Sequence, residues 1–253
     1  MDEPKVLIAA PIGGTKQYSI NDWFEWIAMQ TYNNFDVCIC INGKDADELI
    51  SKFKQVEIYH QNTGITKMIN ILELKNSCQL STIQKITYSR EKIRRYASDN
   101  KYDYIFFLDT DTIPLRLNSI STLMKWGMDV ISGVYFYKNT SQPVIIDKYT
   151  HTNISIKKLE LAAISFKLIE VWGFGFGCLL IEKNVFMKNH FDYDLFGEER
   201  TDDFGYCHVL EQAGIKRYLD PDILCRHLDD PANEDIKKER GQTLFYFHKN
   251  YKD

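Results

Sequence analysis

Long hydrophobic runs and an excess of positive charge are both missing from this chain. No apolar stretch approaches the ~18 residues of a membrane-spanning helix, and the start, MDEPKVLIAAP, lacks the charged-then-apolar layout of a signal peptide. The 31 Lys and Arg against 35 Asp and Glu give a formal net charge of -4, which disfavours phosphate-backbone binding. We therefore expect a cytoplasmic protein with no transmembrane segment and no nucleic-acid partner.

Paired cysteine motifs, repeats and low-complexity segments are also absent. The six cysteines form no C-x-x-C pair, and most lie in apolar segments such as DVCICI, so we expect them to be reduced and buried. A chain of 253 residues with 44% hydrophobic content can bury a large core. Because no linker-like boundary interrupts it, we expect a single domain over 1–253.

Short apolar runs alternate with helix-like segments in the first half, as in βαβ units that form a parallel sheet. The expected strands are VLIAAP, FDVCICI, QVEIYH and YIFFLD, and the expected helices cover 19–30, 45–54 and a stretch near 65–74. Ser19 with Asp22 resembles a capping box, and Ser89 resembles the N-cap of a helix that carries Arg90. The first half is therefore expected to be a parallel α/β unit.

The alternation of strand-like and helix-like segments changes after residue 114. A short helix is expected near 118–126, followed by strand-like segments with little helix between them: DVISGVYFY, QPVIID, KLEL and FKLIEVWGFGFGCLLIE. A further helix is expected at about 202–213, with Gly214 as its stop. This pattern predicts a mixed or antiparallel second half.

Two carboxylates one residue apart follow an apolar run in YDYIFFLDTDTIP, residues 102–114. The D-x-D spacing occurs four times in the chain, and the pairs at 45/47 and 220/222 fit a helix start and a turn. Asp109 and Asp111 differ, because DYIFFL reads as a strand buried on both faces, and ligands collect at the carboxyl ends of such strands. Two hard oxygen ligands there suit Mg²⁺ or Mn²⁺. The alternative is a turn in which an Asp caps the following segment.

Several stretches in order resemble the nucleotide-sugar-dependent glycosyltransferases of the GT-A fold, especially the family-2-like group. They are VLIAAPIGG, CICING, SREKIRRYA, FFLDTD, VWGFGFGCLLI, TDDFGYC and CRHLD, which together span about residues 5–228. The resemblance implies an α/β, Rossmann-like, three-layer α/β/α fold with a mostly parallel central sheet and a mixed acceptor-side half. It assigns about 1–115 to nucleotide binding, about 116–228 to acceptor binding and 229–253 to a C-terminal tail.

The resemblance also implies roles for individual carboxylates. Asp109 and Asp111 would bind the metal with His227, although a lone histidine in such a segment is often structural. Asp203, or else Asp202, would be the catalytic base of an inverting transfer, which removes the proton of the attacking acceptor hydroxyl. Both acids also suit the positive end of a helix for purely structural reasons.

The predicted donor contacts, some of them implied by the resemblance and others by the residues themselves, come from several segments. They comprise Pro11, Asn42, Arg90, Asp109, Thr110, Trp172 and Gly175. Asn42 stands where many members carry an Asp, and it can still hydrogen-bond a pyrimidine. Arg90 can pair with a diphosphate as a planar fork, or it can belong to a solvated helix face. Trp172 offers a stacking face for a sugar, and the glycines of WGFGFG permit close approach of a ligand or mark a bulge.

The sequence therefore predicts an enzyme, a hexosyltransferase-like glycosyltransferase, which uses Mn²⁺ or Mg²⁺ to move a sugar from a nucleoside diphosphate donor, UDP-linked, to an acceptor hydroxyl. The acceptor class stays open among glycans, lipid-linked molecules and proteins, with peripheral membrane contact allowed. Retaining chemistry, which needs no such base, also stays open. The rival readings are a sugar nucleotidyltransferase, for which PIGGTK is a poor phosphate loop, and a catalytically silent binding module of the same fold.

Overall fold

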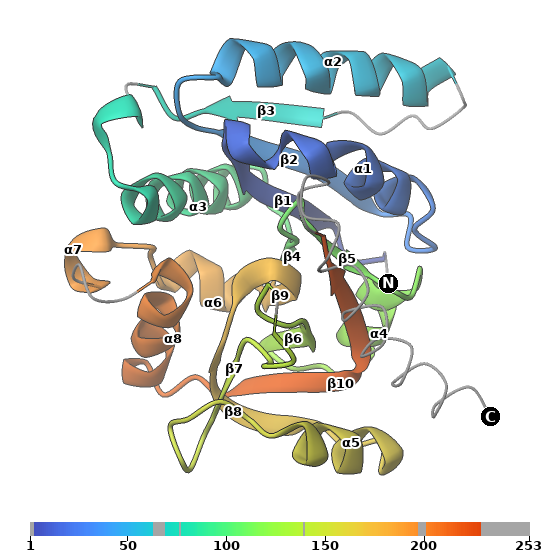
Figure 1. The fold of residues 1–253 in the computed structure, drawn as a ribbon, viewed down its shortest axis with the longest axis vertical. Coiled ribbons are helices and arrows are strands. Elements are labelled where there is room, and N and C mark those ends of the chain that lie inside the picture. The colour runs from blue at the N-terminus through green and yellow to red at the C-terminus, as the bar shows by residue number, and fades with distance from the viewer. Residues whose placement is uncertain (1–2, 63–68, 76, 139, 197–200, 229–253) are drawn as a thin grey trace.

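The computed structural model describes residues 3–62, 69–75, 77–138, 140–196 and 201–228. The predicted tail, 229–253, lies outside the described residues. A single sheet runs through the molecule in the strand order β3-β2-β1-β4-β9-β6-β10-β8-β7, and a further strand, β5, pairs with β10 (Figure 1).

The first half of the sheet is parallel, as predicted. It consists of β1 (Val6–Ile12), β2 (Phe35–Ile41), β3 (Ile69–Glu73) and β4 (Tyr104–Phe107). In β1, Val6 pairs with Phe35 of β2 on one side and with Tyr104 of β4 on the other. The carboxyl ends of these strands therefore meet at one edge of the sheet, where the candidate ligands follow them.

The second half of the sheet is mixed, also as predicted. Its strands are β5 (Thr112–Pro114), β6 (Val130–Val134), β7 (Ile145–Asp147), β8 (Ile169–Phe174), β9 (Leu179–Glu182) and β10 (Arg217–His227). Strand β9 lies between β4 and β6 and is antiparallel to both, whereas β10 is parallel to β6 and antiparallel to β8 and β5. Strand β9 thus joins the two halves into one sheet.

Helices pack on both faces of the sheet. The α-helices are α1 (Ile20–Ala28), α2 (Ala46–Asn62), α3 (Thr82–Asp99), α4 (Ser119–Lys125), α5 (Ile156–Ile164), α6 (Lys183–Lys188), α7 (Tyr193–Phe196) and α8 (Asp202–Gln212), and short 3₁₀ helices are η1 (Gly14–Ser19), η2 (Ser77–Gln79) and η3 (Phe176–Cys178). None of the helices in the described ranges is long and apolar enough to cross a bilayer.

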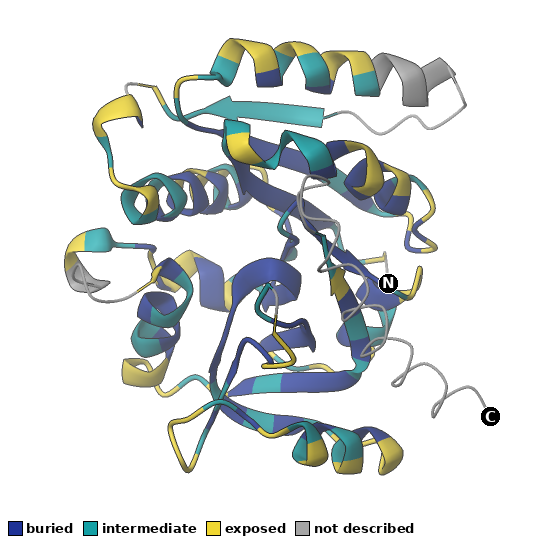
Figure 2. Ribbon diagram, in the orientation of Figure 1, coloured by how far each residue is buried: buried dark blue, intermediate teal, exposed yellow. Residues whose placement is uncertain are grey.

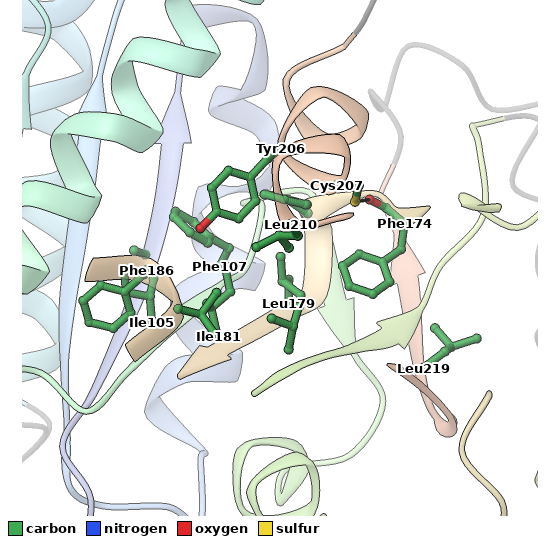
Figure 3. Packing of buried hydrophobic residues seen from close by; sticks show 14 of the residues in the cluster. Ile105, Phe107, Phe174, Leu179, Ile181, Phe186, Tyr206, Cys207, Leu210 and Leu219 are labelled. Atoms are coloured by element: carbon green, nitrogen blue, oxygen red, sulfur yellow. Dashed lines mark hydrogen bonds between the residues drawn. The ribbon is translucent and has the colours of Figure 1, made fainter. Parts of the chain in front are cut away.

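Two hydrophobic cores result, because successive residues of a strand point to opposite faces. Leu7 and Ala9 of β1 pack with side chains of α3, α6 and α8, whereas Val6 and Ile8 pack with side chains of α1, α2 and α4. The buried residues follow the central strands, and the exposed residues line the outer sides of the helices (Figure 2). Figure 3 shows part of the first core, where α8 packs over the sheet.

One predicted helix cap and one predicted helix start are wrong. Ser19 directly precedes α1, as predicted, but its side chain does not cap the helix, since its hydroxyl donates to the Lys16 carbonyl and shares a hydrogen bond with the Thr110 hydroxyl. Helix α3 begins seven residues before Ser89: Ser81 caps it through a capping box with Gln84. Ser89 is a buried residue inside the helix, and its hydroxyl accepts from Asn42.

Three predicted segments also change type. QVEIYH belongs to α2, in which Leu49, Phe53 and Val56 repeat at helical spacing against the second core. The stretch expected to be helical near 65–74 instead contains β3, which pairs with β2. KLEL belongs to α5, where Ser155 caps the start and Leu159 and Ala163 are buried one turn apart.

Candidate functional site

A cavity of about 200 Å³ opens at the carboxyl ends of the parallel strands. Pro11 of β1, Asn42 directly after β2 and Asp109 shortly after β4 form its sheet side. Helices α3 and α8, which pack on the same face of the sheet, supply most of its other wall. Its lining residues are Pro11, Gly13, Thr15, Lys16, Asn42, Thr82, Lys85, Ile86, Arg90, Asp109, Tyr135, Phe176, Asp202 and Asp203.

Asp111 lies beside this cavity between two lysines and a histidine. Lys16 Nζ is 2.8 Å from its Oδ1, and Lys138 Nζ is 2.7 Å from its Oδ2. His227 Nε2 lies 3.4 Å from Oδ2. The Asp111 side chain is only 1% exposed, so these groups hold a buried negative charge.

The charges of this cluster fix its protonation states. Burial alone would raise the pKa of Asp111, but Lys16, His227 and Lys138 outweigh burial and hold that pKa well below its ordinary value. Burial likewise opposes the charged form of Lys16, yet Asp109 and Asp111 raise its pKa above the ordinary value. The carboxylate and the ammonium group are therefore both charged near neutral pH.

Arg90 connects the end of β4 to the start of α8. Its guanidinium lies 3.1 Å from Asp109 Oδ1 and forms a second ion pair with Asp202. The side chain is buried, with its guanidinium carbon 5.0 Å from the centre of the Phe176 ring. Arg90 therefore does not belong to a solvated helix face, because two carboxylates hold its buried guanidinium.

Asp203 occupies the first turn of α8 and lines the cavity. Its Oδ1 accepts hydrogen bonds from the Thr201 hydroxyl and, at 2.8 Å, from the Phe204 amide. Burial raises the pKa of Asp203 above its ordinary value, although the Thr201 hydrogen bond and the Arg90 charge oppose that rise. A raised pKa favours proton acceptance by this carboxylate.

The predicted metal ligands are close together but are held by other partners. Within the described ranges, no three His, Cys, Asp or Glu side chains are grouped as a metal site requires. The two carboxylates nevertheless fit Mn²⁺ or Mg²⁺, and an imidazole is a common further metal ligand. His227 Nε2 faces Asp111, and its Nδ1 lies 2.8 Å from the Phe136 carbonyl, which can only accept. Hydrogen bonds of this kind orient histidine ligands in metal sites.

Three of the predicted donor contacts lie outside the cavity lining. Thr110 is fully buried and accepts from Ser19. The Trp172 indole nitrogen donates to Glu211 at 2.9 Å, and its ring packs against Phe204. A Cβ on Gly175 would lie 1.8 Å from the Tyr135 hydroxyl oxygen, so this glycine makes room for a buried tyrosine.

Sequence reasoning missed Lys16, Lys138 and Tyr135. Lys16 lies in PIGGTK, the stretch that was considered only as a phosphate loop, and the signal was a lysine four residues after a strand that ends at the ligand edge. Lys138 follows the strand β6 by four residues, and no pattern around it indicates a contact with Asp111. Tyr135 lines the cavity, and its hydroxyl accepts from the Gly177 amide at 3.2 Å.

The chain combines a parallel α/β half with a mixed half, and carboxylates and lysines lie where the parallel strands end. A comparison with solved structures shows that this fold is glycosyltransferase-like. The chain aligns with GalNAc-T7, solved with UDP, GalNAc and Mn²⁺, at a TM-score of 0.62 and 10% identity. That alignment covers 90% of this chain and 45% of GalNAc-T7, so the chain spans less than half of that protein.

A second solved structure, A197 from STIV, is similar over most of both chains. It aligns at a TM-score of 0.50 and 16% identity, and it covers 89% of this chain and 86% of A197. No protein-family model and no curated protein matches the sequence. The likeness is therefore one of fold.

Proposed function

We propose that this protein is a family-2-like, GT-A-type glycosyltransferase that moves a sugar from a nucleoside diphosphate donor, UDP-linked, to an acceptor hydroxyl. The observation that carries the proposal is the cavity at the ends of β1, β2 and β4, where Lys16, Arg90 and Asp109 converge. The similarity of the fold to a protein solved with UDP, GalNAc and Mn²⁺ supports it. The helices on both faces of the sheet support the three-layer arrangement of that fold class.

The cavity offers separate groups for the parts of such a donor. Lys16, Lys85 and Arg90 bring positive charge to a diphosphate. Asn42 has an amide that can hydrogen-bond a pyrimidine base, and its Nδ2 also donates to Ser89 Oγ at 3.2 Å. Pro11 also lines the cavity and would lie beside the base. The donor would then lie along the sheet edge, with its sugar toward α8.

Asp109, Asp111 and His227 would hold Mn²⁺ or Mg²⁺ in this function. Such an ion supplies positive charge that stabilises a leaving diphosphate. The contacts of His227 fit this role because its Nδ1 faces the Phe136 carbonyl. Lys16 and Lys138 add two further positive charges beside the same carboxylate.

Asp203 is the proposed base of an inverting transfer. It lines the cavity, and its pKa is raised by burial, so it can accept the proton of an attacking acceptor hydroxyl. Asp202 is less suited, because its carboxylate forms an ion pair with the buried Arg90. We therefore assign Asp202 to the positioning of Arg90.

The acceptor class and the location are proposed on separate grounds. Exposed Leu161, Ile164 and Phe166 at the end of α5 offer an apolar surface on the second half of the chain, which suits a lipid-linked acceptor and peripheral membrane contact. The six cysteines are free, and five of them are buried. Free thiols suit a reducing compartment such as the cytoplasm.

Hydrolysis of several nucleotide sugars in the presence of Mn²⁺ tests this function. We expect turnover with at least one UDP-sugar and loss of that turnover in Asp111→Asn. A sugar nucleotidyltransferase would instead form a nucleotide sugar from a nucleoside triphosphate and a sugar phosphate. Absence of turnover, together with absence of binding of any nucleoside diphosphate, would contradict the proposed function and favour a silent binding module.

Replacement of Asp203 by Asn tests the base assignment. We expect transfer to an acceptor to fall by about 10²- to 10⁴-fold, because general-base catalysis contributes on that order. Binding of UDP, measured by calorimetry, should stay close to that of the wild type. Full transfer activity in Asp203→Asn would show that Asp203 is not the catalytic base and would favour retaining chemistry. The proposed donor site would not be affected by that result.

A further inference from the structure

The carboxylate of Asp111 is screened from solvent by two lysines. Its side chain is 1% exposed, whereas those of Lys16 and Lys138 are 34% and 36% exposed. The two ammonium groups face different oxygens of the carboxylate, at 2.8 Å and 2.7 Å. A cation that arrives from solvent therefore meets lysines at both oxygens of Asp111.

Both lysines are fixed in place by further contacts. Lys16 Nζ also lies 3.9 Å from Asp109 Oδ2, so its charge lies between the two carboxylates of the D-x-D pair. Lys138 Nζ donates to the Tyr18 hydroxyl at 2.8 Å, and this hydroxyl donates in turn to the Leu228 carbonyl at 3.3 Å. The Leu228 amide donates to the Asp111 carbonyl at 2.6 Å. Three chain segments, those of Lys16 with Tyr18, of Lys138 and of Leu228, thus surround Asp111.

We propose that Lys16 and Lys138 block the binding of a metal ion to the Asp111 carboxylate. A bound nucleoside diphosphate removes this block, because its own anionic oxygens attract the two ammonium groups away from Asp111. A divalent cation beside Asp111 would be repelled by two ammonium charges that already bond the carboxylate. A diphosphate offers those ammonium groups other anionic oxygens, and Lys16 already lines the cavity that it would occupy. This inference rests on the proposed function.

The inference predicts that metal and nucleotide bind cooperatively. A nucleotide that frees Asp111 raises the affinity for the metal, and by linkage the metal raises the affinity for the nucleotide by the same factor. Removal of one lysine should open Asp111 without any nucleotide. The two lysines are therefore expected to set the order of binding, with nucleotide before or together with the metal.

The experiment titrates the full-length protein with Mn²⁺ alone and follows free Mn²⁺ by electron paramagnetic resonance. The variants are Lys16→Ala, Lys138→Ala and, as a second uncharged replacement, Lys138→Gln. Lys92→Ala is the matched control, since it removes one positive charge from an exposed α3 residue whose ammonium group contacts the Glu73 carbonyl. Circular dichroism confirms that each variant is folded.

We expect the Lys16 and Lys138 variants to bind Mn²⁺ at least tenfold more tightly than the wild type and the Lys92 variant. Tight Mn²⁺ binding by the free wild type, equal to that of the variants, would overturn the inference, as would unchanged weak binding by all the variants.

A second titration repeats the wild-type measurement with saturating UDP. We expect Mn²⁺ binding to tighten at least tenfold, and equal affinity with and without bound UDP would overturn the inference. If UDP does not bind at all, in the presence or absence of Mn²⁺, the proposed function fails. The titrations without nucleotide still decide whether the lysines block metal binding to Asp111.

Discussion

At the scale of single residues, the position of a carboxylate could be predicted, but its partners could not. Asp109 and Asp111 stood out because a buried strand precedes them, and the end of a strand is a local property of the sequence. Lys16 and Lys138 are separated from Asp111 by 95 and 27 positions, and they reach it only through the packing of η1 and the loop after β6. Such contacts depend on the whole fold.

A second buried charge, Glu91, links α3 to the segment after α6. Its carboxylate accepts from Arg94 at 2.7 Å and 2.8 Å, from Arg95 at 2.9 Å and from the Phe191 amide at 3.1 Å. Burial alone would raise the pKa of Glu91, but these hydrogen bonds outweigh burial and lower the pKa to about 2. Ionised Glu91 therefore stabilises the folded state.

The low pKa of Glu91 predicts a loss of stability in acid. Because the folded pKa lies below the ordinary value of 4.5, the stabilisation is complete above about pH 4.5 and declines as the pH falls toward 2. At about 1.4 kcal/mol per pKa unit, it amounts to about 3 kcal/mol. Urea unfolding between pH 6 and pH 2 measures it.

Glu91→Gln is the variant that isolates this effect. It should be less stable than the wild type at pH 6, since the buried Arg94 loses its counter-charge. Its free energy of unfolding should also depend less on pH between 4.5 and 2. An equal pH dependence in the two proteins would show that other carboxylates carry the acid sensitivity.

At the scale of elements, the sequence located most strands and helices but often misplaced their limits. The strands around the site and helix α8 were expected where they occur, because their apolar runs are bounded by clear punctuation such as Gly214, which adopts φ +70°. The start of α3 was missed because Ser81 and Ser89 both precede helix-like patterns, as Ser19 does before α1. Only the tertiary contacts of Ser19 and Ser89 show that their hydroxyls serve other partners.

The packing of α8 predicts a large effect of Leu210→Ala. Leu210 is fully buried in the first core, beside Tyr206 and Cys207 of the same helix (Figure 3). Its truncation should lower the free energy of unfolding by about 2–5 kcal/mol, since a buried Leu to Ala change leaves a cavity. Chemical denaturation measures this loss.

Leu161→Ala is the matched control on α5. Leu161 is 57% exposed, so its truncation should change the free energy of unfolding by no more than about 0.5 kcal/mol. Similar losses for Leu210 and Leu161 would contradict the assignment of α8 to the core.

At the scale of the whole molecule, the chain is proposed to be one domain because its sheet is shared. The alternation of the first half predicted a parallel sheet, and the sparse helices of the second half predicted mixed pairing. The sequence could not predict that β9 returns to lie between β4 and β6, because strand order depends on long-range packing. This insertion places β9, a strand of the second half, against β4 of the first half, so the two halves share one sheet.

The shared sheet predicts that both halves unfold together. Hydrogen exchange at low urea concentrations should give the amides of β2, in the first half, and of β8, in the second, the same free energy of global opening. A much lower value for β8 than for β2 would indicate two independent folding units and would contradict the single-domain proposal.

The insertion of β9 also sets an order for folding during synthesis. When the ribosome has made the parallel strands β1 to β4, one edge of β4 has no partner, and it stays open until residues 108–178 have been added and Leu179–Glu182 emerge. An open, apolar strand edge is a site of wrong association between chains. The nascent chain is therefore most exposed to aggregation while its second half is being translated, after its parallel half has already been made.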